Sequence, residues 1–166
     1  MRLIEPSPQW RDAFLEMARD WRSVGDQRYA PAVLNFEGYL RRLDNHRRGE
    51  HLPPDRVPGT EFWLEDGGVL LAGLRLRFRR NQELEREGGH IGYDVRPSAR
   101  RRGYGTQLLA LGLVEARARG ISPVLLTADA DNVGSIRIIE KNGGVLAEEV
   151  ISVQTLKPIR RYWIQG

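Results

Sequence analysis

The chain contains no cysteine among its 166 residues. A thiol nucleophile, a disulfide framework and a zinc site with cysteine ligands are therefore excluded. A chain without cysteine is compatible with a reducing compartment, and we expect a cytoplasmic protein.

Long apolar runs are also missing. No stretch approaches the roughly 18 apolar residues that indicate a membrane span, and residues 1–6, Met-Arg-Leu-Ile-Glu-Pro, lack the apolar region of a signal peptide. We therefore expect no membrane partner.

Lysine is scarce, because only Lys141 and Lys157 are present and almost all positive charges are arginine. The formal net charge of +4 could indicate a nucleic-acid partner. The arginines are, however, scattered along the chain and interleaved with acidic residues, which does not favour a nucleic-acid surface. A compact phosphate-bearing ligand would need only one local cluster.

The length is that of one domain with a single sizeable core. No internal repeat, low-complexity segment or linker divides the chain. We expect one domain over residues 1–166, acting as a monomer or a homodimer.

Hydrophobic periodicity and turn residues predict ten elements in the order α-α-β-β-β-α-β-α-β-β. The expected ranges are 7–24, 35–48, 60–65, 69–78, 90–95, 104–119, 124–127, 132–142, 145–153 and 159–164. Asp66-Gly67-Gly68 predicts a hairpin turn between the first two strands, and Asn132 is typical of a helix cap. Residues 52–59 and 80–89 are expected to be connections.

The most informative segment lies between the third strand and the third helix, at Arg100-Arg101-Arg102-Gly103-Tyr104-Gly105-Thr106. A helix N-terminus offers unpaired N–H groups to an anion, and glycines allow a phosphate to approach the backbone. The dinucleotide fingerprint lacks its third glycine here, and the Gly-Lys-Ser/Thr ending of nucleoside triphosphatases is absent.

Two motifs resemble those of the GNAT N-acetyltransferase superfamily. Arg100-x-x-Gly103-x-Gly105 is similar to its Arg/Gln-x-x-Gly-x-Gly/Ala pyrophosphate signature, and Asn132-x-x-Ser135 is similar to the segment that lines the far side of its coenzyme channel. Residues 89–97 and 135–144, with Leu3-Ile4-Glu5-Pro6, particularly resemble a poorly characterised bacterial subgroup of predicted acetyltransferases.

The resemblance implies a mixed α+β fold with a central, mostly antiparallel, twisted sheet flanked by helices. Its central strands, residues 90–95 and 124–128, would splay apart, so that the pantetheine arm of acetyl-coenzyme A could bind as an added strand. The backbone at Val95 would hold the thioester end. The implied pyrophosphate ligands are Arg100, Arg101, Arg102, Gly103, Tyr104, Gly105 and Thr106.

Asn132 and Ser135 would contact the pantetheine under the same resemblance. Each has a simpler interpretation, Asn132 as a helix cap and Ser135 as a small packing residue. No metal is expected.

Acyl transfer to an amine needs a proton acceptor, because a free alkylamine with a pKa near about 10.4 is mostly protonated at neutral pH. The candidates are His90, Asp94 and Tyr93. Strand alternation places His90 and Asp94 on one face, where they could share a wall of the cleft, and Tyr93 on the other. A structural role for His90 is the competing interpretation.

One position departs from the family pattern. A tyrosine that protonates the leaving thiolate usually precedes the Glu-Lys pair, and Ile139 stands there instead. Tyr104 or water could replace it, because a thiolate is a tolerable leaving group.

These features predict an acetyl-coenzyme A-dependent N-acyltransferase that acts on a primary amine of a small molecule or a protein. The alternative is a catalytically inactive coenzyme A-binding sensor, suggested by Ile139 and by the lack of an obvious carboxylate base. A nucleic-acid-binding protein is the third hypothesis, and its binding would depend steeply on salt.

Overall fold

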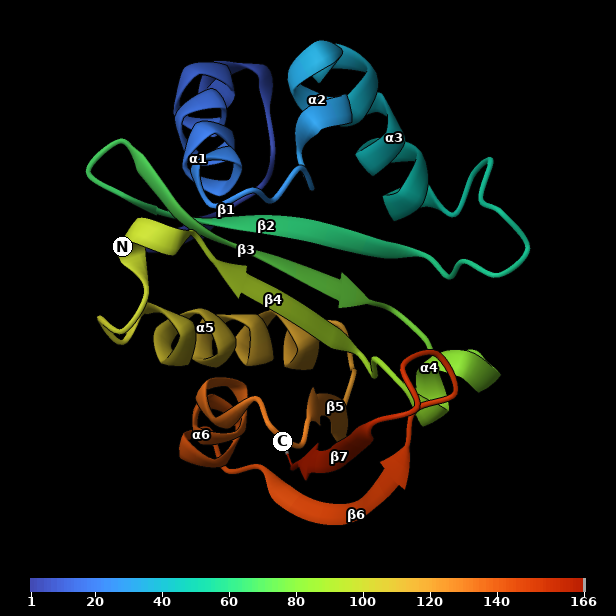
Figure 1. Cartoon of the computed structure of the whole chain (residues 1–166). Helices are drawn as coiled ribbons and strands as arrows, with labels where there is room; N and C mark the ends of the chain where they lie inside the picture. Colours follow the sequence, from blue (N-terminus) through green and yellow to red (C-terminus); the bar gives the residue numbers. More distant parts are fainter. Residues whose placement is uncertain (166) are drawn as a thin grey trace.

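The computed structural model describes residues 1–165 and forms the elements drawn in Figure 1. In chain order these are β1 (Arg2–Ile4), a 3-10 turn (Pro8–Trp10), α1 (Arg11–Ser23), α2 (Ala30–Leu34), α3 (Phe36–Arg48), β2 (Gly59–Asp66), β3 (Val69–Arg77), α4 (Gln82–Arg86), β4 (Ile91–Val95), a second 3-10 turn (Pro97–Ala99), α5 (Tyr104–Ala118), β5 (Val124–Asp129), α6 (Val133–Lys141), β6 (Val145–Ile151) and β7 (Pro158–Ile164). Helices α1 to α3 cover one face of the larger sheet, and α5 lies against the other (Figure 1).

All ten predicted elements are present, and three short ones were missed. Strand β1 has three residues, and α2 and α4 have five residues each, which is too short for a periodic pattern. Helix α4 occupies the predicted connection 80–89, where the side chain of Asn81 accepts a hydrogen bond of 2.9 Å from the N–H of Leu84. A single polar cap therefore starts a helix that composition alone did not indicate.

The strands form two antiparallel sheets. The larger has the order β1-β2-β3-β4 and the smaller has the order β5-β7-β6. The splay expected between the third and fourth predicted strands is therefore real, since β4 and β5 belong to different sheets. In the larger sheet Arg75 lies opposite Glu61 on one side and Gly92 on the other, which places these residues in one row across three strands.

The two sheets touch just before β4 begins. The N–H of His90 donates to the carbonyl of Leu125 at 2.8 Å, and the N–H of Leu125 donates back to Nδ1 of His90 at 2.9 Å. Gly89 has a φ of 59°, and a Cβ there would collide with the carbonyl oxygen of Leu125. The glycine thus permits the close approach, and β4 and β5 separate beyond it.

Two hydrophobic cores hold the helices on the larger sheet. On one face Phe14 of α1 stacks on Trp63 of β2, with ring centroids 5.1 Å apart. On the other face Leu108 of α5 and Leu74 of β3 are fully buried in one cluster. Each fully buried side chain of this size contributes about 1.5–3 kcal/mol relative to exposure. Because β3 alternates, Arg75 points to the face opposite Leu74.

Candidate functional site

A basic cavity of about 870 Å³ lies where the end of β4 meets the start of α5 and of α6. Arg28, Arg100, Arg101, Arg137 and Lys141 are among the residues that line it. Asp94 is the one acidic lining residue among those the structure describes. A concave surface with this excess of positive charge suits an anionic ligand.

The turn before α5 has the geometry of an anion cradle. Arg101 and Gly103 have positive φ values of 62° and 85°, so the chain bends sharply before the helix. Within residues 1–165, the backbone N–H groups of residues 101–105 have no hydrogen-bond acceptor. Successive unpaired N–H groups at a helix N-terminus attract phosphate, and left-handed backbone at a non-glycine residue such as Arg101 is a strained feature found at functional sites.

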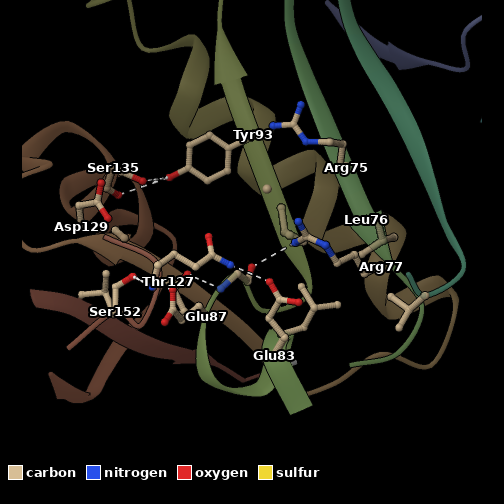
Figure 2. Close-up of a pocket in the computed structure, with 18 of the residues that line it drawn as sticks. Arg75, Leu76, Arg77, Glu83, Glu87, Tyr93, Thr127, Asp129, Ser135 and Ser152 are labelled. Atoms are coloured by element: carbon tan, nitrogen blue, oxygen red, sulfur yellow. Dashed lines mark hydrogen bonds between the residues drawn. The ribbon is translucent and has the colours of Figure 1, made fainter. Parts of the chain in front are cut away.

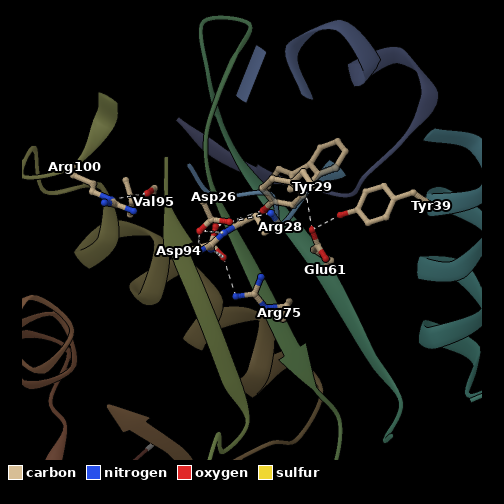
Figure 3. Close-up of polar contacts among 10 residues, drawn as sticks. Asp26, Arg28, Tyr29, Tyr39, Glu61, Arg75, Asp94, Val95 and Arg100 are labelled. Carbon is tan, nitrogen blue, oxygen red and sulfur yellow. Dashed lines mark hydrogen bonds and ion pairs between the residues drawn. The ribbon is translucent and has the colours of Figure 1, made fainter. Parts of the chain in front are cut away.

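Arg100 is held in place beside this turn. Its Nε donates to the carbonyl of Val95 at 3.2 Å (Figure 3). Its guanidinium lies 5.0 Å from the ring centre of Trp21. Arg28 stacks on the same ring at 3.6 Å. Trp21 is 2% exposed, so the indole is a buried support that orients two cationic side chains toward the cavity.

A second cavity, of about 680 Å³, is lined by the first half of β4, whereas the basic cavity is lined by its second half (Figure 2). It lies between the ends of β2 and β3, helix α4 and the loop between β6 and β7. Arg75, Tyr93, Asn132 and Ser135 line both cavities. The two spaces therefore meet at the middle of β4 and the start of α6.

The junction is marked by a tyrosine–serine pair. The hydroxyls of Tyr93 and Ser135 share a hydrogen bond of 2.8 Å (Figure 2). Burial raises the pKa of Tyr93, and the hydrogen bond with Ser135 opposes that rise. The side chain of Asn132 accepts from the N–H of Ser135 at 3.0 Å, so Asn132 caps α6 while it lines both spaces.

The sequence profile of the acetyltransferase (GNAT) family matches residues 10–144, which is most of the chain. The chain belongs to the GNAT acetyltransferase family. Acyl transfer is the general activity of this family. A comparison with curated protein sequences found no match.

Solved structures of GNAT proteins share this fold at low sequence identity. RimJ of Mycobacterium smegmatis in complex with CoA-disulfide has a TM-score of 0.74 and 18% identity, over 99% of this chain and 81% of that one. A ribosomal-protein-alanine N-acetyltransferase of Brucella melitensis has a TM-score of 0.67 and 18% identity, over 100% of both chains. YncA of Salmonella typhimurium with acetyl-CoA has a TM-score of 0.63 and 16% identity, over 98% of this chain and 92% of that one.

Nine of the ten residues predicted to bind the coenzyme line the basic cavity of this GNAT fold. They are Val95, Arg100, Arg101, Gly103, Tyr104, Gly105, Thr106, Asn132 and Ser135. Arg102 is exposed and does not line the cavity, because the turn directs consecutive residues to different sides. Gly105 also differs from expectation, since a Cβ there would meet the side chain of Ile138 at 2.5 Å. Its absent side chain thus lets α5 and α6 pack closely.

His90 does not share a wall of the cleft with Asp94, contrary to the expectation. It is 6% exposed, it precedes β4, and its ring bonds to the backbone of Leu125. Burial, with Arg80 and Arg77, lowers the pKa of His90 to about 4. His90 lines neither cavity in the part of the chain described, so its observed contacts are structural.

Asp94 lies in the basic cavity but is bound by two arginines. Its Oδ2 is 2.9 Å from Nη2 of Arg75 and 3.1 Å from Nη1 of Arg28, and Oδ1 accepts a long hydrogen bond of 3.5 Å from Tyr29 (Figure 3). Burial, then Asp94, raises the pKa of Tyr29. A carboxylate that neutralises two guanidiniums is a positioning group rather than a free proton acceptor.

Glu61 was not predicted and is the better-placed carboxylate. Its Oε1 accepts from the hydroxyl of Tyr39 at 2.7 Å and from Nε1 of Trp63 at 3.1 Å, whereas Oε2 has no donor among the described residues (Figure 3). Burial raises the pKa of Glu61, although Tyr39 and Arg75 oppose this. The one feature of the sequence that could have indicated Glu61 is its acidic side chain within an otherwise apolar strand.

Ile139 is fully buried in the core, whereas Ile138 lines the basic cavity. The position at which the family pattern has tyrosine is therefore filled by a packing residue. A tyrosine there would overpack the core.

Residues 1–165 offer neither a metal-binding cluster nor a membrane-spanning helix. No group of three or more histidine, aspartate or glutamate side chains is arranged to hold a metal ion. None of the described helices combines the length and the apolar character that a membrane crossing requires.

Proposed function

We propose that this protein transfers an acetyl group from acetyl-coenzyme A to a primary amine. The observation that carries the proposal is the pair of cavities that meet at Tyr93 and Ser135, one basic and one of mixed charge. A two-substrate reaction needs this arrangement, because the two reacting groups must approach from separate spaces and meet at one point.

The basic cavity fits the coenzyme. The unpaired N–H groups of residues 101–105, with Arg100 and Arg101, would hold the pyrophosphate. The edge of β4 that faces away from β3 has no strand partner in the described chain, so the pantetheine would add there as a strand. When bound, the coenzyme supplies a thioester carbonyl and a thiolate leaving group.

The chain's own residues handle the protons. Oε2 of Glu61 would take a proton from the incoming ammonium, and burial, which raises the pKa of Glu61, makes this carboxylate a stronger base. The Tyr93 hydroxyl, ordered by Ser135 at the junction, would give a proton to the departing thiolate. The amine nitrogen would gain the acyl group as the carbon–sulfur bond breaks, and the second proton that the nitrogen loses would return to the Tyr93 oxygen, which has given its proton to the thiolate.

The second cavity also favours an enzyme over a module that only binds the coenzyme. A sensor would need the basic cavity alone, whereas here a space of about 680 Å³ leads to the same junction. This volume suits a small-molecule acceptor.

Thiol release from acetyl-coenzyme A, measured with a panel of amines, tests this function. We expect turnover with at least one amine, and Glu61→Gln should lower it by about 10²–10⁴-fold, because glutamine keeps the hydrogen bonds of Oε1 but does not accept a proton. The wild-type rate should fall as the pH drops below the pKa of Glu61.

Glu83→Gln is the matched control, because Glu83 lines the same cavity and its carboxylate accepts from the amide of Gln154. Equal losses in both variants would remove Glu61 from the mechanism. Calorimetric binding of acetyl-coenzyme A without thiol release for any amine would contradict the enzyme.

A further inference from the structure

One arginine in the second cavity has no carboxylate partner among residues 1–165. Nη1 of Arg77 donates to the carbonyls of Gly88 and Gly89, at 3.2 Å each, which fixes the guanidinium (Figure 2). Its Nη2 and Nε have no acceptor in the described chain. Arg77 therefore presents two unused donor groups in a cavity that it lines.

The other arginines of this cavity are neutralised or exposed. Arg75 is paired with Asp94 at 2.9 Å, and Arg56 is largely exposed and 3.9 Å from Asp55. A Cβ on Gly92 would lie 3.6 Å from Nε of Arg75 and 3.7 Å from Nη2 of Arg77. Two guanidiniums thus converge above a residue without a side chain.

The electrostatic environment of Arg77 favours an added anion. Burial lowers the pKa of Arg77, and the charges of Arg75 and Arg56 lower it further. A partly desolvated cation beside like charges is costly unless an opposite charge reaches it. The charge of Glu83 opposes these effects, but no carboxylate of residues 1–165 forms an ion pair with Arg77, so a ligand can supply the missing partner.

An acidic residue, Glu61, lies near Arg77 on the same face of the larger sheet. Glu61 is opposite Arg75 in the sheet, and Arg77 is two residues further along β3, so Glu61 and Arg77 are diagonal neighbours. Their backbones are about 7–8 Å apart in such a pair. An anion site and a proton acceptor are thus built into one small space.

We propose that the acceptor is a small zwitterion, a primary amine that also carries a carboxylate, with the carboxylate on Arg77 and the amine toward Glu61. This inference rests on the proposed function. A carboxylate matches the planar fork of one guanidinium. A doubly charged phosphate would face the acidic residues that also line the cavity, namely Asp55, Glu61, Glu83, Glu87 and Asp129.

The test compares amino acids with their C-terminal amides, which keep the amine and lose the carboxylate. We expect kcat/KM for thiol release to be at least about tenfold higher for the acid of each pair, as for a charge-assisted hydrogen bond. The amide's amine loses its proton more readily, so this preference opposes intrinsic reactivity. In Arg77→Met the acid-to-amide ratio should fall to about one or below, because only the intrinsic reactivity of the two amines then remains.

Arg79→Gln is the control, because Arg79 is exposed and lines neither cavity, and it should keep the wild-type ratio. A general structural effect of Arg77→Met would lower both rates and leave the ratio unchanged, which would contradict the proposal. So would turnover that favours the amides or polyamines.

Binding gives a second readout that does not need turnover. In nuclear magnetic resonance titrations of the acetyl-coenzyme A-loaded protein, an amino acid should shift the Gly92 amide and Arg77 Nε signals, and its amide should not. If no amine releases thiol, the proposed function fails, and these shifts still decide the carboxylate site. Their absence would overturn it.

Discussion

Tyr93 is the residue in which the donor and acceptor sides of the site come together. Its hydroxyl forms a hydrogen bond with Ser135 on α6, and its side chain lines both cavities. Because Ile139 is buried, the proposed mechanism needs another proton donor for the thiolate, and we propose the Tyr93 hydroxyl at the junction. Burial raises its pKa, which keeps it protonated at neutral pH.

Tyr93→Phe should therefore lower kcat for thiol release by about 10–10²-fold, because a proton donor helps but a thiolate can leave without one. Acetyl-coenzyme A affinity, measured by calorimetry, should change little, since the ring remains. Tyr104→Phe is the comparison, because Tyr104 lines only the basic cavity. A larger loss in Tyr104→Phe would assign the proton to that residue.

At this scale the sequence predicted the residues of a local motif and missed those that depend on strand register. Arg100, Arg101 and Gly103 are close in sequence, so one turn places them together. Glu61 and Arg77 meet only because β2 and β3 pair with Glu61 opposite Arg75. For His90, alternation predicted the wrong environment, since the residue precedes β4 and binds the second sheet.

The turn before α5 is the element on which the proposed coenzyme binding depends. Its three consecutive arginines differ in direction, because Arg100 and Arg101 line the basic cavity and Arg102 does not. The positive φ values of Arg101 and Gly103 produce this division. Composition alone could not distinguish the three.

We expect the double variant Arg100→Gln/Arg101→Gln to lower acetyl-coenzyme A affinity by about 10–100-fold, since hydrogen bonds to charged groups are strong. Calorimetry measures the affinity, and the loss should shrink as salt is added. Arg102→Gln should bind as the wild type does. An equal loss of affinity in Arg102→Gln would show that the three arginines act through their net charge, and that it does not matter which of them line the cavity.

Longer elements could be predicted, and the short ones could not. Helix α5 has apolar positions over 15 residues, whereas α2 and α4 have five residues each and give no period. Helix α4 matters for function because it walls the second cavity. The acceptor side was therefore the less predictable half of the site.

In the whole molecule the site exists because two sheets touch at one end and separate at the other. His90 and Leu125 exchange two hydrogen bonds at the contact, and Gly89 allows it. Strands β4 and β5 then separate, which leaves the edge of β4 free toward the basic cavity. The splay was implied by the family resemblance, and the contact that limits it required the structure.

This contact should make stability depend on pH. Burial, with Arg80 and Arg77, lowers the pKa of His90 in the folded protein from 6.5 to about 4. Only the neutral ring can accept from the N–H of Leu125. The unfolded chain therefore binds the proton first as the pH falls. The contribution is complete above pH 6.5 and is lost as the pH drops toward 4.

We expect the free energy of unfolding, measured with urea, to fall by about 1–3 kcal/mol across this range. His90→Asn should flatten that dependence, because an amide oxygen can accept from Leu125 without titrating. His51→Asn, at an exposed histidine, should keep the wild-type slope. A His90→Asn slope equal to the wild-type slope would show that another group, such as His46, whose pKa burial also lowers, carries the dependence. The contact between His90 and Leu125 would then not depend on pH.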